Sequence, residues 1–224
     1  ALYTQNFTTA TNAYNVAVGR SAGLSVTTGT GNTLIGGLAG DATTTGTGNT
    51  AVGNESLGAN TTGSDNVAIG KDALDANTTA DDNTAVGKSS LGSNTTGANN
   101  VAVGRSALLA NTTGADNTAT GYRALYTNTT GAQNVAMGTS ALQNNETGAN
   151  NTAIGWRALL VNTAGDNVAI GSGALSANTT GNTNIAVGAS ALDANVAGDR
   201  NVAIGFEALS TMNPSGNVDT LNTA

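Results

Sequence analysis

A short motif, Asn-[Val/Thr/Ile]-Ala-x-Gly, recurs along the chain at a nearly fixed spacing, and this period constrains the fold more than any other feature. Successive copies start 17 residues apart, except for one step of 16 residues from Asn151 to Asn167. The starting asparagines are Asn15, Asn32, Asn49, Asn66, Asn83, Asn100, Asn117, Asn134, Asn151, Asn167, Asn184 and Asn201. Tandem copies of this length predict a solenoid of about twelve coils, in which each copy forms one coil.

Each copy begins with a segment that alternates as a β-strand does. In the copy that starts at Asn66, Val67 and Ile69 flank Ala68, which is the two-residue period of a strand. Stacked coils would place the Val and Ile residues in one continuous ladder. The alanine on the other face is nearly invariant, so a second layer covers it. We expect that layer to be a neighbouring chain, with Ala102 and Ala136 at the interface, or else a second sheet of the same chain.

A glycine follows every one of these segments, and the chain should turn there because glycine tolerates positive φ and close backbone approach. We expect the asparagines and glycines of successive coils to stack into structural columns. Coils spaced ~4.8 Å apart would give a rod about 50 Å long, in which side-chain amides pair from coil to coil. Members of these columns are Asn66, Gly70, Asn83, Gly87, Asn100 and Gly104.

The two ends depart from the repeat. Residues 1–14 fit it poorly but contain Tyr3, Phe7 and Tyr14, which predicts an N-terminal cap or a junction. The repeat domain spans 15–216. A degraded start at Asn217 and the single proline, Pro214, indicate that 217–224 is a terminal coil or tail. Capping matters because an open solenoid end is an unpaired strand edge.

Asn-Val-Ala-Ile-Gly, at 66–70, 167–171 and 201–205, resembles the core motif of YadA-like head domains in trimeric autotransporter adhesins. With Ala-Leu and Asn-Thr-Thr-Gly added, the repeat is also similar to repeats of bacteriophage tail fibres. The resemblance covers 15 to about 209. It implies a left-handed parallel β-roll, three coaxial chains and a role in attachment. The 17-residue period is longer than the repeat of the adhesin heads, so the loops must differ.

Composition excludes several functional classes. The chain contains no cysteine or histidine, and its serines are scattered, so no nucleophile–base pair can be drawn and we expect no enzyme and no cofactor. A net charge of −7 argues against nucleic acid binding. No apolar run approaches the ~20 residues of a membrane span, and we expect no membrane insertion by this segment. Turn aspartates are a candidate calcium column, but turn formation explains them more simply; they are Asp65, Asp82, Asp116, Asp166 and Asp199.

The candidate receptor-binding residues follow the conserved glycine in three coils. These pairs are Tyr122-Arg123, Trp156-Arg157 and Phe206-Glu207. Tyr122 and Trp156 should lie two coils apart on one edge, about 10 Å from each other. Aromatic rings beside arginine suit contacts with a sugar or a protein. The alternative is that the rings fold over the edge or pack against a neighbouring chain.

The sequence therefore favours a fibre segment with an attachment role. We expect a homotrimer, located outside the cell on a bacterial surface or on a virion fibre, that contacts a carbohydrate or protein receptor. The alternative is a monomeric ice- or surface-binding solenoid. Its support is a regular array of threonine pairs in the turns, Thr61-Thr62, Thr95-Thr96, Thr112-Thr113 and Thr129-Thr130.

Overall fold

The computed structural model describes residues 1–5, 12–212 and 218–219. The chain divides into two compact units, Ala1–Ala115 and Asp116–Ala224. Both consist of short strands joined by turns, and the described residues contain no helix. Phe7, Pro214 and Asn217, to which the sequence assigned roles at the chain ends, lie outside the described residues.

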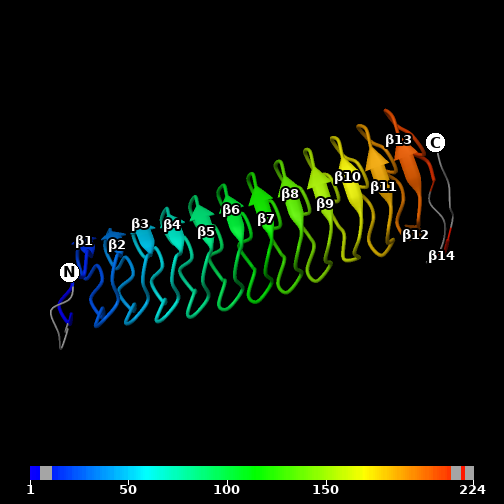
Figure 1. Ribbon diagram of the computed structural model, residues 1–224. Helices are drawn as coiled ribbons and strands as arrows, with labels where there is room; N and C mark the ends of the chain where they lie inside the picture. The colour runs from blue at the N-terminus through cyan, green and yellow to red at the C-terminus, as the bar shows by residue number, and fades with distance from the viewer. Residues whose placement is uncertain (6–11, 213–217, 220–224) are drawn as a thin grey trace. The chain divides into compact units, whose positions relative to one another are not determined.

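The first unit is a ladder of six parallel three-residue strands, one from each coil (Figure 1). Every strand residue pairs with the residue 17 positions later, as Val67 does with Thr84 and Ile69 with Val86. The strands are β1 (Val16–Val18), β2 (Thr33–Ile35), β3 (Thr50–Val52), β4 (Val67–Ile69), β5 (Thr84–Val86) and β6 (Val101–Val103). This arrangement confirms the predicted all-β parallel β-solenoid with a 17-residue spacing.

The second unit repeats this ladder. Its strands are β7 (Thr118–Thr120), β8 (Val135–Met137), β9 (Thr152–Ile154), β10 (Val168–Ile170), β11 (Ile185–Val187) and β13 (Val202–Ile204). Thr152 pairs with Val168 across the 16-residue step, so the missing residue leaves the strand register intact. A separate two-stranded sheet joins β12 (Gly198–Asp199) to β14 (Val218–Asp219), also in parallel.

The central alanine of each strand points into its own coil. Ala68, Ala102 and Ala136 are 0% exposed within the single chain. The chain itself covers this face, with turn residues in place of the expected second sheet, and the placement of an interchain interface at Ala102 and Ala136 is wrong. The physical reason is the narrow coil interior, which accepts alanine beside the buried leucine of the following turn, such as Leu74.

The β-branched residues that flank this alanine lie on the outer face of the sheet. Ile69 is 40% exposed and Val103 is 37% exposed. Across the twelve three-residue strands of the described chain, the two outward positions hold only Val, Ile, Thr and Met. Each unit therefore presents an uncharged, largely apolar sheet face. We call the outward positions of β1–β6 and of β7–β11 with β13 the outer sheet face.

One coil reverses the usual packing of the interior. Leu34 replaces the inward alanine in β2 and is fully buried, while Gly23 and Gly40 stand where later coils carry leucine. A Cβ on Gly23 would lie 2.8 Å from Leu34 Cδ1, and one on Gly40 would lie 2.7 Å from Leu34 Cδ2. In this coil the large buried side chain, Leu34, comes from the strand instead of the turn, and Gly23 and Gly40 leave the space that it occupies.

The glycine after a strand is required on two grounds where a further coil follows. Gly87 has φ +130°, outside the usual range of residues with a side chain. A Cβ there would also lie 2.7 Å from the carbonyl carbon and oxygen of Gly104 in the next coil. Close stacking of backbone on backbone therefore fixes glycine at this position.

Two buried columns of asparagine tie the coils together. In the first column, Asn49 donates a side-chain hydrogen bond to Asn32 Oδ1 at 3.1 Å and another to the Gly63 carbonyl of its own coil at 2.9 Å. In the second column, Asn77 Nδ2 donates to Asn60 Oδ1 at 3.0 Å. Each buried amide thus joins a coil to its neighbour and closes a turn, so its polar atoms remain satisfied.

The first five residues lie against the first coil. Leu2 donates its backbone N–H to the Ala22 carbonyl at 3.2 Å, and Thr4 Oγ1 donates to the Leu24 carbonyl at 2.7 Å. These contacts partner carbonyls of the first coil, on the side where no earlier coil of this chain stacks.

Candidate functional site

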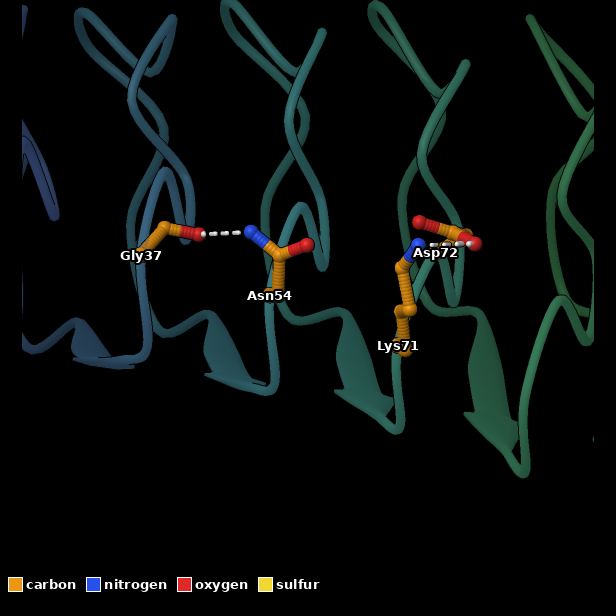
Figure 2. Close-up of polar contacts among 4 residues, drawn as sticks. All are labelled: Gly37, Asn54, Lys71 and Asp72. Atoms are coloured by element: carbon orange, nitrogen blue, oxygen red, sulfur yellow. Dashed lines mark hydrogen bonds and ion pairs between the residues drawn. The ribbon is translucent and has the colours of Figure 1, made fainter.

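The candidate site lies on the edge formed by the two residues that follow each conserved glycine. Figure 2 shows this edge in the first unit, where Asn54 Nδ2 donates to the Gly37 carbonyl at 3.1 Å and Lys71 Nζ lies 3.7 Å from Asp72 Oδ2. Gly37, Asn54 and Lys71 occupy the same position in successive coils. Side chains on this edge therefore stack in register along the unit.

The second residue of each edge pair has a left-handed backbone. Its φ is +57° at Asp72, +55° at Arg123, +55° at Arg157 and +54° at Ser190. Residues of very different size adopt this conformation, so the backbone alone does not demand glycine at this position. The side chain at this position can therefore differ from coil to coil without changing the backbone conformation.

In the second unit, two of the predicted pairs form cation–π stacks. The Arg123 guanidinium carbon lies 5.2 Å from the centre of the Tyr122 ring and 5.0 Å from the centre of the Tyr126 ring. The Arg157 guanidinium carbon lies 5.0 Å from the centre of the Trp156 ring. Trp156 is 54% exposed, so much of its ring remains open to solvent while the arginine covers part of it.

A hollow of about 280 Å³ opens beside Trp156. Its lining comes from three successive coils: Trp156, Arg157, Leu160, Gly173, Ser176 and Ser190. Trp156 and Leu160 supply apolar surface, Ser176 and Ser190 supply hydroxyls, and Arg157 supplies the positive charge. We call this group of six residues the Trp156 hollow.

The third predicted pair does not join this hollow. Phe206 and Glu207 follow the glycine of β13, and neither lines the hollow. Phe206 is 76% exposed, and its neighbour brings a negative charge instead of a positive one. The structure therefore brings only two of the three predicted pairs into the same kind of arrangement.

Sequence reasoning missed Tyr126, which stacks on Arg123, and four residues of the Trp156 hollow: Leu160, Gly173, Ser176 and Ser190. One signal was available, because Gly173 is the only glycine at a position held elsewhere by Ser, Leu, Asp, Glu or Arg. The sequence alone does not show that a missing side chain there leaves room beside a tryptophan in the preceding coil.

The first unit carries an acidic cluster that sequence reasoning also missed. Burial raises the pKa of Asp75 above 3.8, and the charges of Asp72, Glu55 and Asp41 raise it further. Burial likewise raises the pKa of Asp41. A Cβ on Gly58 would lie 2.6 Å from Asp75 Oδ1 and 3.8 Å from Asp41 Oδ1, so both carboxylates face this glycine from adjacent coils.

The turn aspartates have a local structural role. Asp65, Asp82 and Asp116 have φ between +56° and +59°, which aspartate tolerates better than most residues. Asp199 accepts a hydrogen bond from the Asn182 backbone N–H at 2.7 Å. Within 1–5, 12–212 and 218–219, no group of three or more acidic residues is arranged to hold a metal ion.

The threonine pairs of the turns are divided in role. Thr61 Oγ1 donates to the Thr78 carbonyl of the next coil at 3.0 Å, and Thr95 Oγ1 donates to the Thr112 carbonyl at 2.9 Å. The second threonine of each pair, such as Thr62, is exposed. Only one hydroxyl of each of these pairs is therefore presented to solvent.

No family model, no curated protein and no solved structure matches the chain. The described residues also hold no helix long and apolar enough to cross a membrane.

Proposed function

We propose that the chain is a structural attachment module of an extracellular fibre, on a bacterial surface adhesin or a phage tail fibre, and not an enzyme. In this proposal each coil winds left-handed, and three copies assemble around a common axis through the outer sheet face. The edge that carries Trp156 and Tyr122 then contacts a carbohydrate or protein receptor. The resemblance of the Asn-Val-Ala-Ile-Gly motif supports the handedness and the trimer.

The outer sheet face is the observation that carries this proposal. In the first unit it includes Val16, Val18, Ile35, Ile69, Val101 and Val103, each between 36% and 58% exposed. Apolar patches of this continuity on a soluble chain mark surfaces that bind another molecule. The face contains no charged residue, so nothing on it opposes close approach of a second apolar sheet.

A second copy of the same chain is the occupant that fits this face best. Its own outer sheet face repeats with the same 17-residue period, so contacts made by one coil recur at every following coil. A partner of different period would match at one coil and fall out of register at the next. Symmetric self-association therefore covers the whole face with a single kind of contact.

Native mass tests the proposal directly. Light scattering coupled to size exclusion on the 21.7 kDa chain should give three times that mass. A monomer, unchanged over a hundredfold range of protein concentration, would overturn the fibre model. A dimer would refute the coaxial trimer while retaining the outer sheet face as an interface between copies.

Binding to ice or a mineral surface by the monomer is the second candidate function. The observation that favours it is that three of the six strands in the first unit place a threonine outward, Thr33, Thr50 and Thr84, beside Ile35, Val52 and Val86. This is a different surface from the turn threonines, half of whose hydroxyls bond to backbone. Thermal hysteresis of the purified monomer is the expected result for ice binding, and freezing at the colligative temperature refutes ice binding.

A further inference from the structure

The Trp156 hollow exists because one side chain is absent. Gly173 occupies the edge position that Arg157 and Ser190 occupy in the adjacent coils. Its φ of +70° is close to the +54° of Ser190, so a serine would fit the backbone equally well. A Cβ on Gly173 would meet only Ser190 Oγ, at 3.7 Å, and would otherwise enter open space. The missing side chain therefore leaves room for a ligand.

The surfaces around that room suit a sugar ring. The exposed Trp156 ring and Leu160 form an apolar side against which the C–H face of a pyranose can stack. Ser176 and Ser190 provide hydroxyls that donate to and accept from sugar hydroxyls. A volume of about 280 Å³ lies at the small end of ligand pockets, which fits one monosaccharide better than a peptide segment.

The charge of the hollow selects an acidic sugar. Arg157 stacks on Trp156 and forms no ion pair with a carboxylate anywhere in the described ranges. Ser140 and Gly173, which hold the same position in the adjacent coils, are neutral. An arginine in this setting keeps its donors available for a carboxylate, which it binds in a bidentate manner.

We propose that the Trp156 hollow binds a hexuronic acid residue of an acidic polysaccharide, with the sugar ring on Trp156 and its carboxylate on Arg157. This proposal rests on the attachment function and names the chemical class of its receptor. It excludes Phe206-Glu207 from the site, since that pair carries the wrong charge for an acidic ligand.

A second contact lies along the same edge of the second unit. Arg123, with the rings of Tyr122 and Tyr126, precedes Arg157 by two coils, about 10 Å at the usual strand spacing. In a polysaccharide that alternates uronic acid with a neutral sugar, carboxylates recur every second sugar, a similar distance. A chain of this kind laid along the coil axis places one carboxylate at each arginine.

Trp156 itself reports on the binding, because it is the single tryptophan of the chain. Tryptophan fluorescence of the full chain is titrated with sodium glucuronate and with glucose, which differ only in the carboxylate. We expect a saturable change with glucuronate and binding about tenfold weaker for glucose, the size of one charge-assisted hydrogen bond. Equal affinity for the two sugars, or no saturable change with either, overturns the proposal.

Variants separate the site from a general charge effect. Arg157→Gln should weaken glucuronate binding about tenfold, and Gly173→Ser should also weaken it, because it places in the hollow a side chain that other coils carry. Lys88→Gln removes the same charge from an edge position in the first unit and should bind as the unmodified chain does. If Lys88→Gln weakens binding as much as Arg157→Gln, the attraction is nonspecific and the assignment fails.

The second contact is tested with a tetrasaccharide of alternating glucuronate and N-acetylglucosamine. It should bind at least tenfold more tightly than glucuronate, because the second carboxylate binds at a high effective concentration. Arg123→Gln should remove that gain, so that the tetrasaccharide then binds about as tightly as glucuronate. No gain for the tetrasaccharide refutes the paired site. If the native protein is a trimer that does not bind glucuronate, the sugar site is refuted and the fibre proposal stands. If it is a monomer that binds glucuronate, the fibre proposal is refuted and the sugar site stands.

Discussion

The Oδ1 atom of Asn66 accepts two hydrogen bonds from Asn83 in the next coil, from the backbone N–H at 3.0 Å and from the side-chain Nδ2 at 3.3 Å. Both residues are 0% exposed. Asn83 Oδ1 in turn accepts from the Asn100 N–H at 3.0 Å. Asn66 Nδ2 also donates to Asn49 Oδ1 of the preceding coil at 3.2 Å and to the Ala80 carbonyl of its own coil at 2.8 Å. The Asn66 amide therefore bonds to its own coil and to the coils on both sides, and no apolar residue of the same size can replace it.

Asn83→Ala should lower the free energy of unfolding by roughly 2–4 kcal/mol, because the substitution leaves the buried Asn100 N–H without its acceptor and removes the Asn83 side-chain bonds. The midpoint of urea denaturation measures the loss. Thr79→Ala, an exposed change in the preceding turn, is the control and should stay within about 0.5 kcal/mol. Equal effects of the two substitutions would contradict the structural role of the column.

Gly87→Ala should be among the most harmful single changes in the first unit. The new Cβ meets the Gly104 backbone at 2.7 Å, and φ is +130°, so a loss of about 2 kcal/mol or more is expected. Gly37→Ala is the matched control, since its Cβ would meet only Asn54 Nδ2 at 3.5 Å. Thermal unfolding of both variants measures the difference in destabilisation. Equal melting temperatures would show that the coils move apart locally and accommodate the new Cβ at position 87 without cost.

Leu34 and the two glycines that face it should be strongly coupled. Leu34→Ala alone creates a cavity and should cost about 2–5 kcal/mol. The triple variant Leu34→Ala, Gly23→Leu, Gly40→Leu restores the arrangement of the other coils and should recover much of that loss. Adding the leucines while Leu34 remains should prevent normal folding, because a Cβ on Gly40 already lies 2.7 Å from Leu34 Cδ2. If the free-energy changes of Leu34→Ala and of the two glycine substitutions simply add in the triple variant, the proposed compensation between the Leu34 side chain and the two glycines is wrong.

The acidic cluster should make stability depend on pH. The pKa of Asp75 is higher in the folded chain than its usual 3.8, so the folded state binds a proton more readily than the unfolded state. Stability should therefore fall as the pH rises from 3.8 through the raised folded pKa. Asp75→Asn should be more stable than the unmodified chain at pH 7, and this advantage should vanish in acid.

Urea midpoints at several pH values measure this dependence. Asp82→Asn, at an exposed turn position of the same unit, is the matched charge change. A uniform gain in both variants would assign the effect to net charge, and no gain in Asp75→Asn would show that neither burial nor the neighbouring carboxylates disfavour the Asp75 charge.

Lysine on the outer sheet face should dissociate the proposed assembly and leave the fold intact. Ile69→Lys with Val103→Lys places two charges on outward positions, so the native mass should fall to that of the monomer while circular dichroism stays unchanged. Ala102→Glu offers the opposite control, since this alanine is fully buried and the charge should unfold its coil. If the double lysine variant remains a trimer, the interface between copies does not lie on the outer sheet face.

The repeat predicted the class of fold because its period, its glycine and its alternating strand agree. The alternation Val67-Ala68-Ile69 established which residues share a face, but it did not show which face is inward. That choice depends on the width of the coil, where Ala68 and Leu74 leave no space for a β-branched side chain. The 16-residue step from Asn151 to Asn167 leaves the strand register intact, because Thr152 still pairs with Val168.

The candidate site was less predictable. Adjacent residues such as Trp156 and Arg157 could be paired by inspection, because their contact is local. The hollow needs Leu160, Gly173 and Ser190 from three coils, and its volume depends on a side chain that is missing. The acidic cluster likewise joins Asp41, Glu55 and Asp75 from successive coils, and no local motif identifies it.

The asparagine column also makes coil number adjustable. Asn66 receives from Asn83 the same hydrogen bonds that Asn49 receives from Asn66, so removal of residues 66–82 would present Asn83 to Asn49 with every bond type preserved. Insertions or deletions of one full period therefore change the reach of this unit by one strand spacing, about 4.8 Å, without creating a new kind of contact. Recombination between such copies lengthens or shortens the protein in equal steps, and each step adds or removes the same kinds of bond between coils.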